Sequence, residues 1–286
     1  MRVLVTGATG FIGSYVVKQL LKQSCEIITS SRDPHKARLC EWFSRVKYIP
    51  YSLNDTKENL FDFFLCPDLL IHLAWEGLPN YKDLIHIEKN LFLNYQFLKT
   101  MIEYGLKSLV VTGTCFEYGM QSGVLNEAMV AMPNNPYGLA KDTLRKFLVH
   151  LQDKIDFEFK WIRLFYMYGR GQAPSSILSQ LDKALENEET SFNMSGGEQL
   201  RDYLPVEKVA EYIVKIAMQN KVHGIINCCS GVPVSIRTLV EDYLEKKQKH
   251  IHLNLGHYPY PDYEPMAFWG DRSSLDQLLN DIKDEE

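Results

Sequence analysis

A tyrosine and a lysine lie four residues apart in the stretch NPYGLAKDTLRKF, at Tyr137 and Lys141. Asn135 is a favourable helix N-cap and Pro136 fits the first helical position, so the stretch predicts a helix over residues 136–152. One turn of that helix places both side chains on the same face. A free phenol has a pKa of about 10, and a nearby ammonium would stabilise the phenolate and bring that pKa toward neutrality. The pair is therefore either a proton donor with its tuning charge or two ordinary positions of an amphipathic helix, and the YxxxK spacing alone does not decide between them.

Three glycines, Gly7, Gly10 and Gly13, lie directly between an apolar run that predicts a strand and a run that predicts a helix. In this context Gly7 permits a tight turn, Gly10 lets the backbone approach a pyrophosphate and Gly13 allows close helix packing. The first helical turn, with Phe11 and Ile12, supplies N–H groups and a positive dipole. The loop therefore predicts dinucleotide binding.

Strand-like and helix-like runs alternate through residues 1–165, which we expect to form a dinucleotide-binding domain. Strands are predicted at residues 2–6, 26–30, 46–50, 68–74, 108–113 and 157–165, and helices at 11–22, 34–43, 56–64, 81–104 and 136–152. Buried strands that alternate with helices are typical of an α/β fold with a Rossmann-type, doubly wound parallel sheet. From residue 166 to 286 the pattern loosens, which indicates a smaller C-terminal α/β substrate lobe. The apolar stretch around 224–229 is expected to return to the main sheet.

Composition excludes several classes of partner. The chain has 286 residues, a net charge of -5 and an apolar fraction of 45%. This acidic balance predicts no general attraction to nucleic acid or to anionic membranes, and no apolar run is long enough to span a bilayer. Neither a signal peptide nor a metal-binding cluster is expected from the sequence. The cysteines have no CxxC spacing and read as reduced thiols of a cytoplasmic protein; they are Cys25, Cys40, Cys66, Cys115, Cys228 and Cys229.

Several motifs together resemble one family. The GxxGxxG loop, IHLA at residues 71–74, VTGTCFEYG, YxxxK and QLRDYLPVEKVAEYI occur in the order found in the extended short-chain dehydrogenase/reductases, a group of sugar-nucleotide epimerases, dehydratases and reductases. The resemblance covers nearly the whole chain. The family places its catalytic Ser or Thr four residues before the loop tyrosine, and counting back from Tyr118 gives Thr114. The resemblance thus implies a catalytic triad of Thr114, Tyr137 and Lys141, in which Lys141 also binds the nicotinamide ribose.

The second strand carries the signal for the cofactor. NAD-using members of the family usually end this strand with an acidic residue, whereas this chain has Ser31 and Arg32. A hydroxyl and a guanidinium suit a 2′-phosphate, which predicts NADP(H), with NAD(H) possible. The alternative is that Arg32 is a solvated loop charge. By position, the resemblance implies further cofactor contacts from Leu73, Ala74, Trp75, Asn90, Thr112 and Phe165.

Departures from the family motifs reduce the number of reactions that this chain is expected to catalyse. Sugar 4,6-dehydratases carry Asp-Glu after the catalytic Thr, and Cys115 and Phe116 cannot supply that acid and base. The Arg32 signal argues mildly against the 4-epimerases, most of which hold NAD tightly. The expected activity is therefore NADPH-dependent reduction of the 4-keto group of a nucleotide-linked 4-keto-6-deoxyhexose for surface polysaccharide. Examples are dTDP-4-keto-6-deoxyglucose reduction to dTDP-fucose, or a 6-deoxytalose-forming relative. The alternatives are a sugar-nucleotide 4-epimerase and a non-catalytic NADP-sensing regulator.

Substrate contacts and assembly are also implied by the resemblance. Arg201 would contact the nucleotide diphosphate, with an internal ion pair as the alternative. Tyr166 replaces the asparagine usual in RxFNxYG, and Gln172 could take over part of its role. Trp269 could line the base or sugar pocket, or it could pack the lobe against the sheet. A homodimer is expected through the helices 81–104 and 136–152; their apolar positions, compatible with that or with core packing, include Leu91, Leu98, Leu144 and Leu148.

Overall fold

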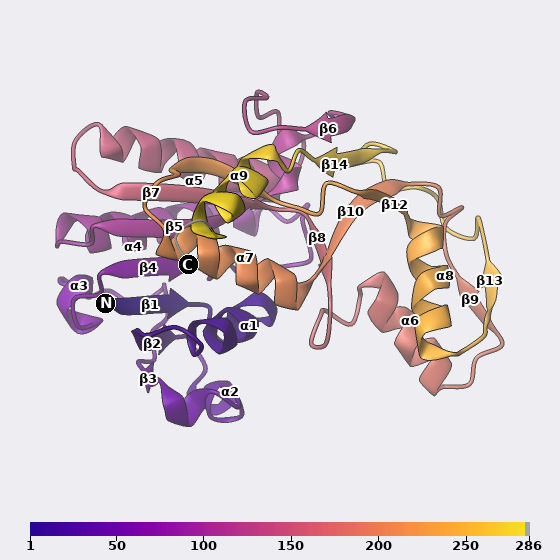
Figure 1. Ribbon diagram of the computed structural model, residues 1–286, viewed down its shortest axis with the longest axis horizontal. Coiled ribbons are helices and arrows are strands. Elements are labelled where there is room, and N and C mark those ends of the chain that lie inside the picture. The colour runs from indigo at the N-terminus through magenta and orange to yellow at the C-terminus, as the bar shows by residue number, and fades with distance from the viewer. Residues whose placement is uncertain (284–286) are drawn as a thin grey trace.

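Seven parallel strands form the main sheet of the computed structural model, which describes residues 1–283 (Figure 1). Their order is β11-β7-β5-β4-β1-β2-β3, and each neighbouring pair is parallel. This confirms the expected α/β fold. The order reverses between β1 and β4, and in such sheets ligands bind in the crevice outside the carboxyl ends at that point. The strands are β1 (Arg2–Thr6), β2 (Glu26–Ser30), β3 (Lys47–Tyr48), β4 (Leu69–His72), β5 (Ser108–Thr114), β7 (Glu158–Leu164) and β11 (Gly224–Cys228).

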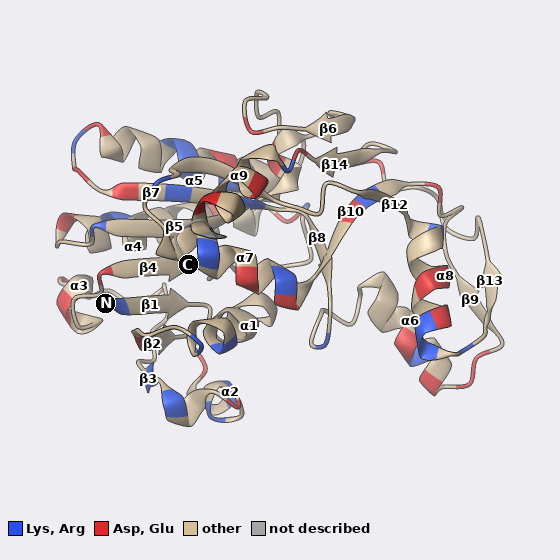
Figure 2. Ribbon diagram, in the orientation of Figure 1, with Lys and Arg blue, Asp and Glu red and all other residues tan. Residues whose placement is uncertain are grey.

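Helices cover both faces of this sheet, as the buried strands require. One face packs against α1 (Phe11–Leu20), α7 (Val206–Met218) and α9 (Ser273–Lys283). The other face packs against α3 (Leu60–Phe63), α4 (Leu91–Glu103) and α5 (Pro136–Gln152). Each layer has its own apolar core. Lys and Arg positions alternate with Asp and Glu positions along the helices of both layers and of the second body (Figure 2).

The second body has a separate small core and lies at one end of the molecule (Figure 1). It contains α6 (Ile177–Glu186), α8 (Ile236–Lys247) and the paired strands β9 (Ser191–Asn193) and β13 (His252–Asn254). Between the two bodies runs a sheet of β8 (Tyr166–Tyr168), β10 (Leu200–Pro205) and β12 (Pro233–Ser235). After residue 166 the chain crosses between the bodies more than once, because α7, β11 and α9 all belong to the main layer.

Several elements are shorter than the sequence predicts, and local capping explains where they begin. Asn59 caps α3 by accepting from the Asp62 N–H, so that helix begins at Leu60. The helix expected from residue 81 begins as a π-helical turn, η2 (His86–Asn90), and continues as α4. The helix expected at 34–43 is α2 (Pro34–Arg38) followed by a 3₁₀ turn, η1 (Phe43–Arg45).

The apolar positions proposed for a dimer contact lie in the interior. Leu91, Leu98, Leu144 and Leu148 are all buried in the core between α4, α5 and the sheet. They therefore cannot form a contact surface, which corrects that part of the dimer prediction in favour of core packing. Exposed apolar side chains on these helices are instead Phe92, Leu139 and Val149. Within residues 1–283 no helix combines the length and apolar character needed to cross a bilayer.

Candidate active site

The three predicted catalytic residues come together at the carboxyl end of β5. Thr114 ends β5, and Tyr137 and Lys141 lie one turn apart on α5. Asn135 caps α5 by accepting from the Gly138 N–H at 2.8 Å, and Pro136 occupies the first turn, as the sequence predicts. The Lys141 Nζ donates to the Thr112 carbonyl oxygen at 2.8 Å, which ties α5 to β5.

Burial shifts the pKa values of Tyr137 and Lys141. It raises the pKa of Tyr137, and nearby Tyr81, Glu117 and Cys115 add to the rise, while a hydrogen bond with the Thr114 hydroxyl acts in the opposite direction. Burial also lowers the pKa of Lys141 to about 7, opposed by the negative charge of Glu117. The sequence-based expectation of a phenol made acidic by Lys141 therefore does not hold here. The phenol is neutral at pH 7, because its burial outweighs the stabilisation that any neighbour gives to the phenolate.

Trp75 joins this group to the carboxyl end of β4. The Lys141 Nζ lies 4.1 Å from the centre of the Trp75 ring, and the Trp75 and Tyr137 ring centres are 6.0 Å apart. The indole Nε1 donates to His86 Nδ1 at 3.0 Å, and His86 Nε2 donates to the Asn80 carbonyl oxygen at 2.9 Å. These bonds fix the indole ring, so its face can stabilise the ammonium.

The glycine loop has the form of an anion cradle. Gly7 has a φ of +68°, and a Cβ there would lie 2.8 Å from the Ala74 backbone nitrogen, so the loop runs against the residues after β4. A Cβ on Gly13 would overlap the Gly7 carbonyl oxygen. Gly10 is the N-cap of α1 and supplies no side-chain acceptor, which leaves the first N–H groups free for a ligand. The loop therefore fits a dinucleotide pyrophosphate. Phe11 and Ile12 form the first turn of α1 over it.

The residues expected near the adenosine ribose have protein partners. Arg32 forms an ion pair with Glu76, which follows β4, and Lys89 contacts the other Glu76 oxygen at 3.5 Å. The pair joins the loops after β2 and β4, which flank β1 on either side. The Ser31 hydroxyl lies 3.1 Å from the Tyr48 hydroxyl. Arg32 is therefore a largely exposed loop charge with a carboxylate as its partner, and not an unopposed phosphate ligand.

The other predicted cofactor contacts lie at different depths. The backbone of Leu73, like that of Ala74, lies directly against Gly7. Asn90 is buried, and its amide donates to the Glu76 carbonyl oxygen at 3.0 Å, so it supports the loop after β4. Thr112 lies two residues before Thr114 on β5 and holds Lys141 through its carbonyl. Phe165 packs in a small core with Tyr118, Cys229 and Phe268.

The predicted substrate arginine is buried and already paired. Arg201 is 2% exposed, and its Nη2 lies 3.3 Å from a Glu264 carboxylate oxygen. The other Glu264 oxygen accepts from the Tyr166 hydroxyl. The internal ion pair that was the alternative for Arg201 is thus present. Gln172 is turned toward its own loop, where its amide donates to the Met167 carbonyl oxygen at 2.8 Å.

The alternation of side chains along a strand decides which of two adjacent aromatic residues, Phe268 or Trp269, faces the interior. On β14 (Phe268–Gly270), which pairs with β6 (Gly123–Leu125), Phe268 is buried and Trp269 is half-buried. Successive side chains on a strand point to opposite faces. Phe268 therefore takes the inner position, 6.1 Å from the Tyr166 ring and 4.5 Å from the Arg201 guanidinium, while Trp269 lies on the other side.

Three residues of the site were not found from the sequence. The Tyr81 ring lies tilted against that of Tyr137 with 5.6 Å between ring centres, and Glu264 reaches the site from a loop without periodicity. Neither carries a sequence signal. Glu117, which lies under Thr114, does carry a sequence signal, because Thr-x-x-Glu is the pattern of a capping box.

Comparison with known proteins gives a consistent family. Residues 3–229 match the model of the "NAD dependent epimerase/dehydratase family". The chain is 32% identical to a "dTDP-6-deoxy-L-talose 4-dehydrogenase (NAD(+))" of Aggregatibacter actinomycetemcomitans, over 94% of this chain and 99% of the relative. It is 26% identical to "UDP-arabinose 4-epimerase 1" of Arabidopsis thaliana, over 97% of this chain and 74% of that protein.

A solved structure shows the same fold. The "UDP-glucose-4-epimerase (galE)" of Stenotrophomonas maltophila, with bound NAD and formylated UDP-arabinopyranose, superposes with a TM-score of 0.86 at 19% identity, over 98% of this chain and 92% of that one. The resemblance to extended short-chain dehydrogenase/reductases is thereby confirmed. The chain belongs to the NAD dependent epimerase/dehydratase family and is an enzyme of the type that acts on sugar nucleotides.

Proposed function

We propose that the chain catalyses nicotinamide-dependent oxidoreduction at C4 of a nucleotide-linked 6-deoxyhexose, with reduction of the 4-keto sugar as its working direction. The observation that carries the proposal is the convergence of Thr114, Tyr137 and Lys141 beside a glycine loop that fits a dinucleotide. Similarity to a dTDP-6-deoxy-L-talose 4-dehydrogenase supports dTDP as the nucleotide and 6-deoxytalose as the reduced sugar.

The geometry supports an acid role for the phenol. When bound, the reduced nicotinamide supplies hydride to the carbonyl carbon. The neutral Tyr137 phenol donates a proton to the carbonyl oxygen as the C4–H bond forms, so a ketone becomes a secondary alcohol. The Thr114 hydroxyl donates a hydrogen bond to the same oxygen and stabilises the charge that develops on it. Lys141 stands one turn away to stabilise the phenolate that remains.

The residues after Thr114 support a simple reduction over dehydration. Cys115 is buried, and burial raises the pKa of its thiol, so it is neither an acid nor a base at neutral pH. Phe116 presents a ring, with its centre 4.7 Å from that of Tyr81 and 6.4 Å from that of Tyr137. The wall beside the phenol is therefore apolar, which suits a sugar whose C6 is a methyl group.

For the cofactor we propose NAD(H) in place of the NADP(H) expected from the sequence. Glu76 neutralises Arg32 and would repel a 2′-phosphate brought between them. Its carboxylate can also accept hydrogen bonds from ribose hydroxyls, a role that an acidic residue at the end of β2 usually has. The talose dehydrogenase to which the chain is similar carries NAD(+) in its name, which is in line with this proposal.

A sugar-nucleotide 4-epimerase is the second candidate, because the same fold and a 26% identical relative carry that activity. The test is incubation of the enzyme with dTDP-6-deoxytalose and NAD⁺, and with the 4-keto sugar and NADH, followed by nicotinamide absorbance and product NMR. Stoichiometric cofactor turnover supports the reductase. An epimeric product without net cofactor change indicates the epimerase. If neither cofactor turnover nor an epimeric product is observed although the protein binds the dinucleotide, the non-catalytic regulator is the remaining hypothesis.

A further inference from the structure

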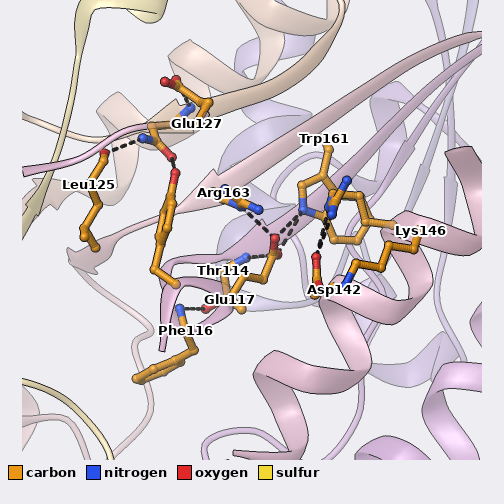
Figure 3. Close-up of polar contacts among 12 residues, drawn as sticks. Thr114, Phe116, Glu117, Leu125, Glu127, Asp142, Lys146, Trp161 and Arg163 are labelled. Atoms are coloured by element: carbon orange, nitrogen blue, oxygen red, sulfur yellow. Dashed lines mark hydrogen bonds and ion pairs between the residues drawn. The ribbon is translucent and has the colours of Figure 1, made fainter. Parts of the chain in front are cut away.

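A buried carboxylate lies beneath the catalytic threonine, in the turn η3 (Cys115–Tyr118) that follows β5. Glu117 is 0% exposed, and its Oε1 accepts from the Thr114 backbone N–H at 2.9 Å (Figure 3). The Thr114 hydroxyl oxygen in turn accepts from the Phe116 N–H at 3.3 Å. This reciprocal arrangement is a capping box, and it fixes both the backbone and the hydroxyl of Thr114. The hydroxyl oxygen accepts from within the turn, and the hydroxyl also shares a hydrogen bond with Tyr137.

Two side chains of β7 hold the carboxylate in place. Arg163 Nε donates to Glu117 Oε2 at 2.7 Å, and Trp161 Nε1 lies 2.9 Å from Oε1 and 3.1 Å from Oε2 (Figure 3). Gly113 is paired in register with Arg163, and a Cβ there would overlap both the Trp161 indole nitrogen and the Glu117 carboxylate. A glycine at that position is therefore what lets the carboxylate reach under β5.

The turn is equally constrained on the side of the phenol. A Cβ on Gly138 would lie 2.7 Å from the Phe116 carbonyl oxygen, so α5 packs directly on the turn. Tyr137 is the residue before this contact, and it shares a hydrogen bond with the Thr114 hydroxyl. Glu117 thus holds the turn to the sheet, and Gly138 holds the Tyr137 helix to the turn.

Stability alone does not account for this network. A buried ion pair contributes little net stability, because desolvation offsets the attraction between the charges. The Arg163 guanidinium also leaves its Nη1 buried without a hydrogen-bond partner. Arg163 Nε donates to the carboxylate while Nη1 has no hydrogen-bond partner, so the arginine is oriented toward Glu117 at the expense of Nη1.

We propose that Glu117 is a positioning residue, which sets the place of the Thr114 hydroxyl relative to Tyr137 through the Thr114 N–H and is itself fixed by Arg163 and Trp161. It touches no reacting atom. The proposal rests on the proposed function and adds a residue that acts through Thr114. An error in position of about 1 Å can cost about 100-fold in rate, so loss of this acceptor is expected to lower kcat by about 10- to 100-fold.

The test compares two double variants that differ in one group. Both replace Arg163 by Met, so that no uncompensated charge remains buried. E117Q/R163M keeps an amide oxygen that can accept from the Thr114 N–H, whereas E117M/R163M removes the acceptor at similar volume. We expect the glutamine form to keep kcat within about threefold of the parent, and the methionine form to lose about 10- to 100-fold with little change in KM or in cofactor affinity.

Each double variant is then combined with T114V. If Glu117 acts through Thr114, the difference between the glutamine and methionine forms falls below about twofold in that background, because contacting residues in one network are not additive. Equal kcat for the two forms, or the same difference with and without the Thr114 hydroxyl, would overturn the proposal. Glu127→Gln is the matched control, since its carboxylate also accepts a backbone N–H, from Asn227 at 2.9 Å, without touching Thr114.

A readout without turnover separates this proposal from the proposed function. The Trp161 indole N–H resonance, assigned with W161F, should keep a hydrogen-bonded shift in the glutamine form and lose it in the methionine form, while thermal unfolding stays similar. If the parent enzyme turns over no keto-sugar nucleotide, the proposed function fails. If it is active and both double variants match it while the indole signal is lost, Glu117 has no positioning role.

Discussion

Replacement of Lys141 by Met is expected to make the protein more stable and less active. Lys141 is 2% exposed, and burial lowers its pKa to about 7 from the ordinary lysine value of 10.5. Between these two pH values the unfolded chain binds the proton and the folded chain releases it. The contribution of Lys141 to the free energy of unfolding therefore increases as the pH rises from 7 to 10.5.

The size of the effect follows from the two pKa values. At 1.36 kcal/mol per tenfold change, Lys141 destabilises the folded state by about 4 kcal/mol at pH 7 and by about 1 kcal/mol at pH 10. These are upper bounds, because the Thr112 carbonyl and the Trp75 ring both favour the ammonium. Loss of a donor to the carbonyl costs the variant about 1 kcal/mol. Lys141→Met should thus gain about 3 kcal/mol or less at pH 7 and almost nothing at pH 10.

Urea unfolding followed by tryptophan fluorescence at both pH values measures this difference. Lys154→Met, at an exposed position beyond the end of α5, is the control and should stay within about 0.5 kcal/mol of the parent at either pH. Turnover by Lys141→Met should fall together with its affinity for dinucleotide. A variant that is less stable than the parent at pH 7, or whose advantage does not shrink by pH 10, would refute the assignment of a strained, desolvated ammonium.

Three further substitutions test the glycine loop, the proton donor and the cofactor preference. Tyr137→Phe should lower kcat by about 10²- to 10⁴-fold in a single-turnover assay while fluorescence titration shows unchanged NADH binding; retained turnover would remove the phenol from the mechanism. Gly13→Ala should destabilise the fold by about 1–3 kcal/mol in urea and weaken dinucleotide binding, since its Cβ would overlap the Gly7 carbonyl; a neutral effect would show that α1 can shift away. Glu76→Gln should raise the ratio of kcat/KM for NADPH over NADH by about fivefold, because Arg32 loses its carboxylate, and an unchanged ratio would exclude Glu76 from cofactor choice.

The parts of the fold that follow from local rules were predictable from the sequence. The helix at Pro136–Gln152 was predicted with its cap and first turn, because Asn135 and Pro136 are local signals that need no tertiary partner. The glycine loop was predicted for the same reason. The parallel sheet followed from the alternation of buried strands with helices, a pattern that few other folds can accommodate.

The remaining features depend on contacts between distant segments. Glu264 reaches Tyr166 across 98 residues of sequence, from a loop with neither periodicity nor a motif. The choice between Phe268 and Trp269 depends on strand register, because a shift of one residue exchanges the two faces. The raised pKa of Tyr137 depends on burial by residues of several elements, so the spacing of Tyr137 and Lys141 alone could not predict it.

Buried charges in this enzyme differ in how completely they are neutralised, and that difference indicates which of them does chemistry. Arg163 is matched by Glu117 and Arg201 by Glu264, and such pairs hold the surrounding turns in place. Lys160, whose pKa burial also lowers, donates to carbonyl oxygens at the end of α7, where the helix dipole favours a cation. Lys141 has one carbonyl and one ring face as direct partners, and burial lowers its pKa to about 7. A cation held this loosely gains more from a phenolate or a ribose hydroxyl than a neutralised one would, so its incomplete pairing is the physical basis for its role beside Tyr137.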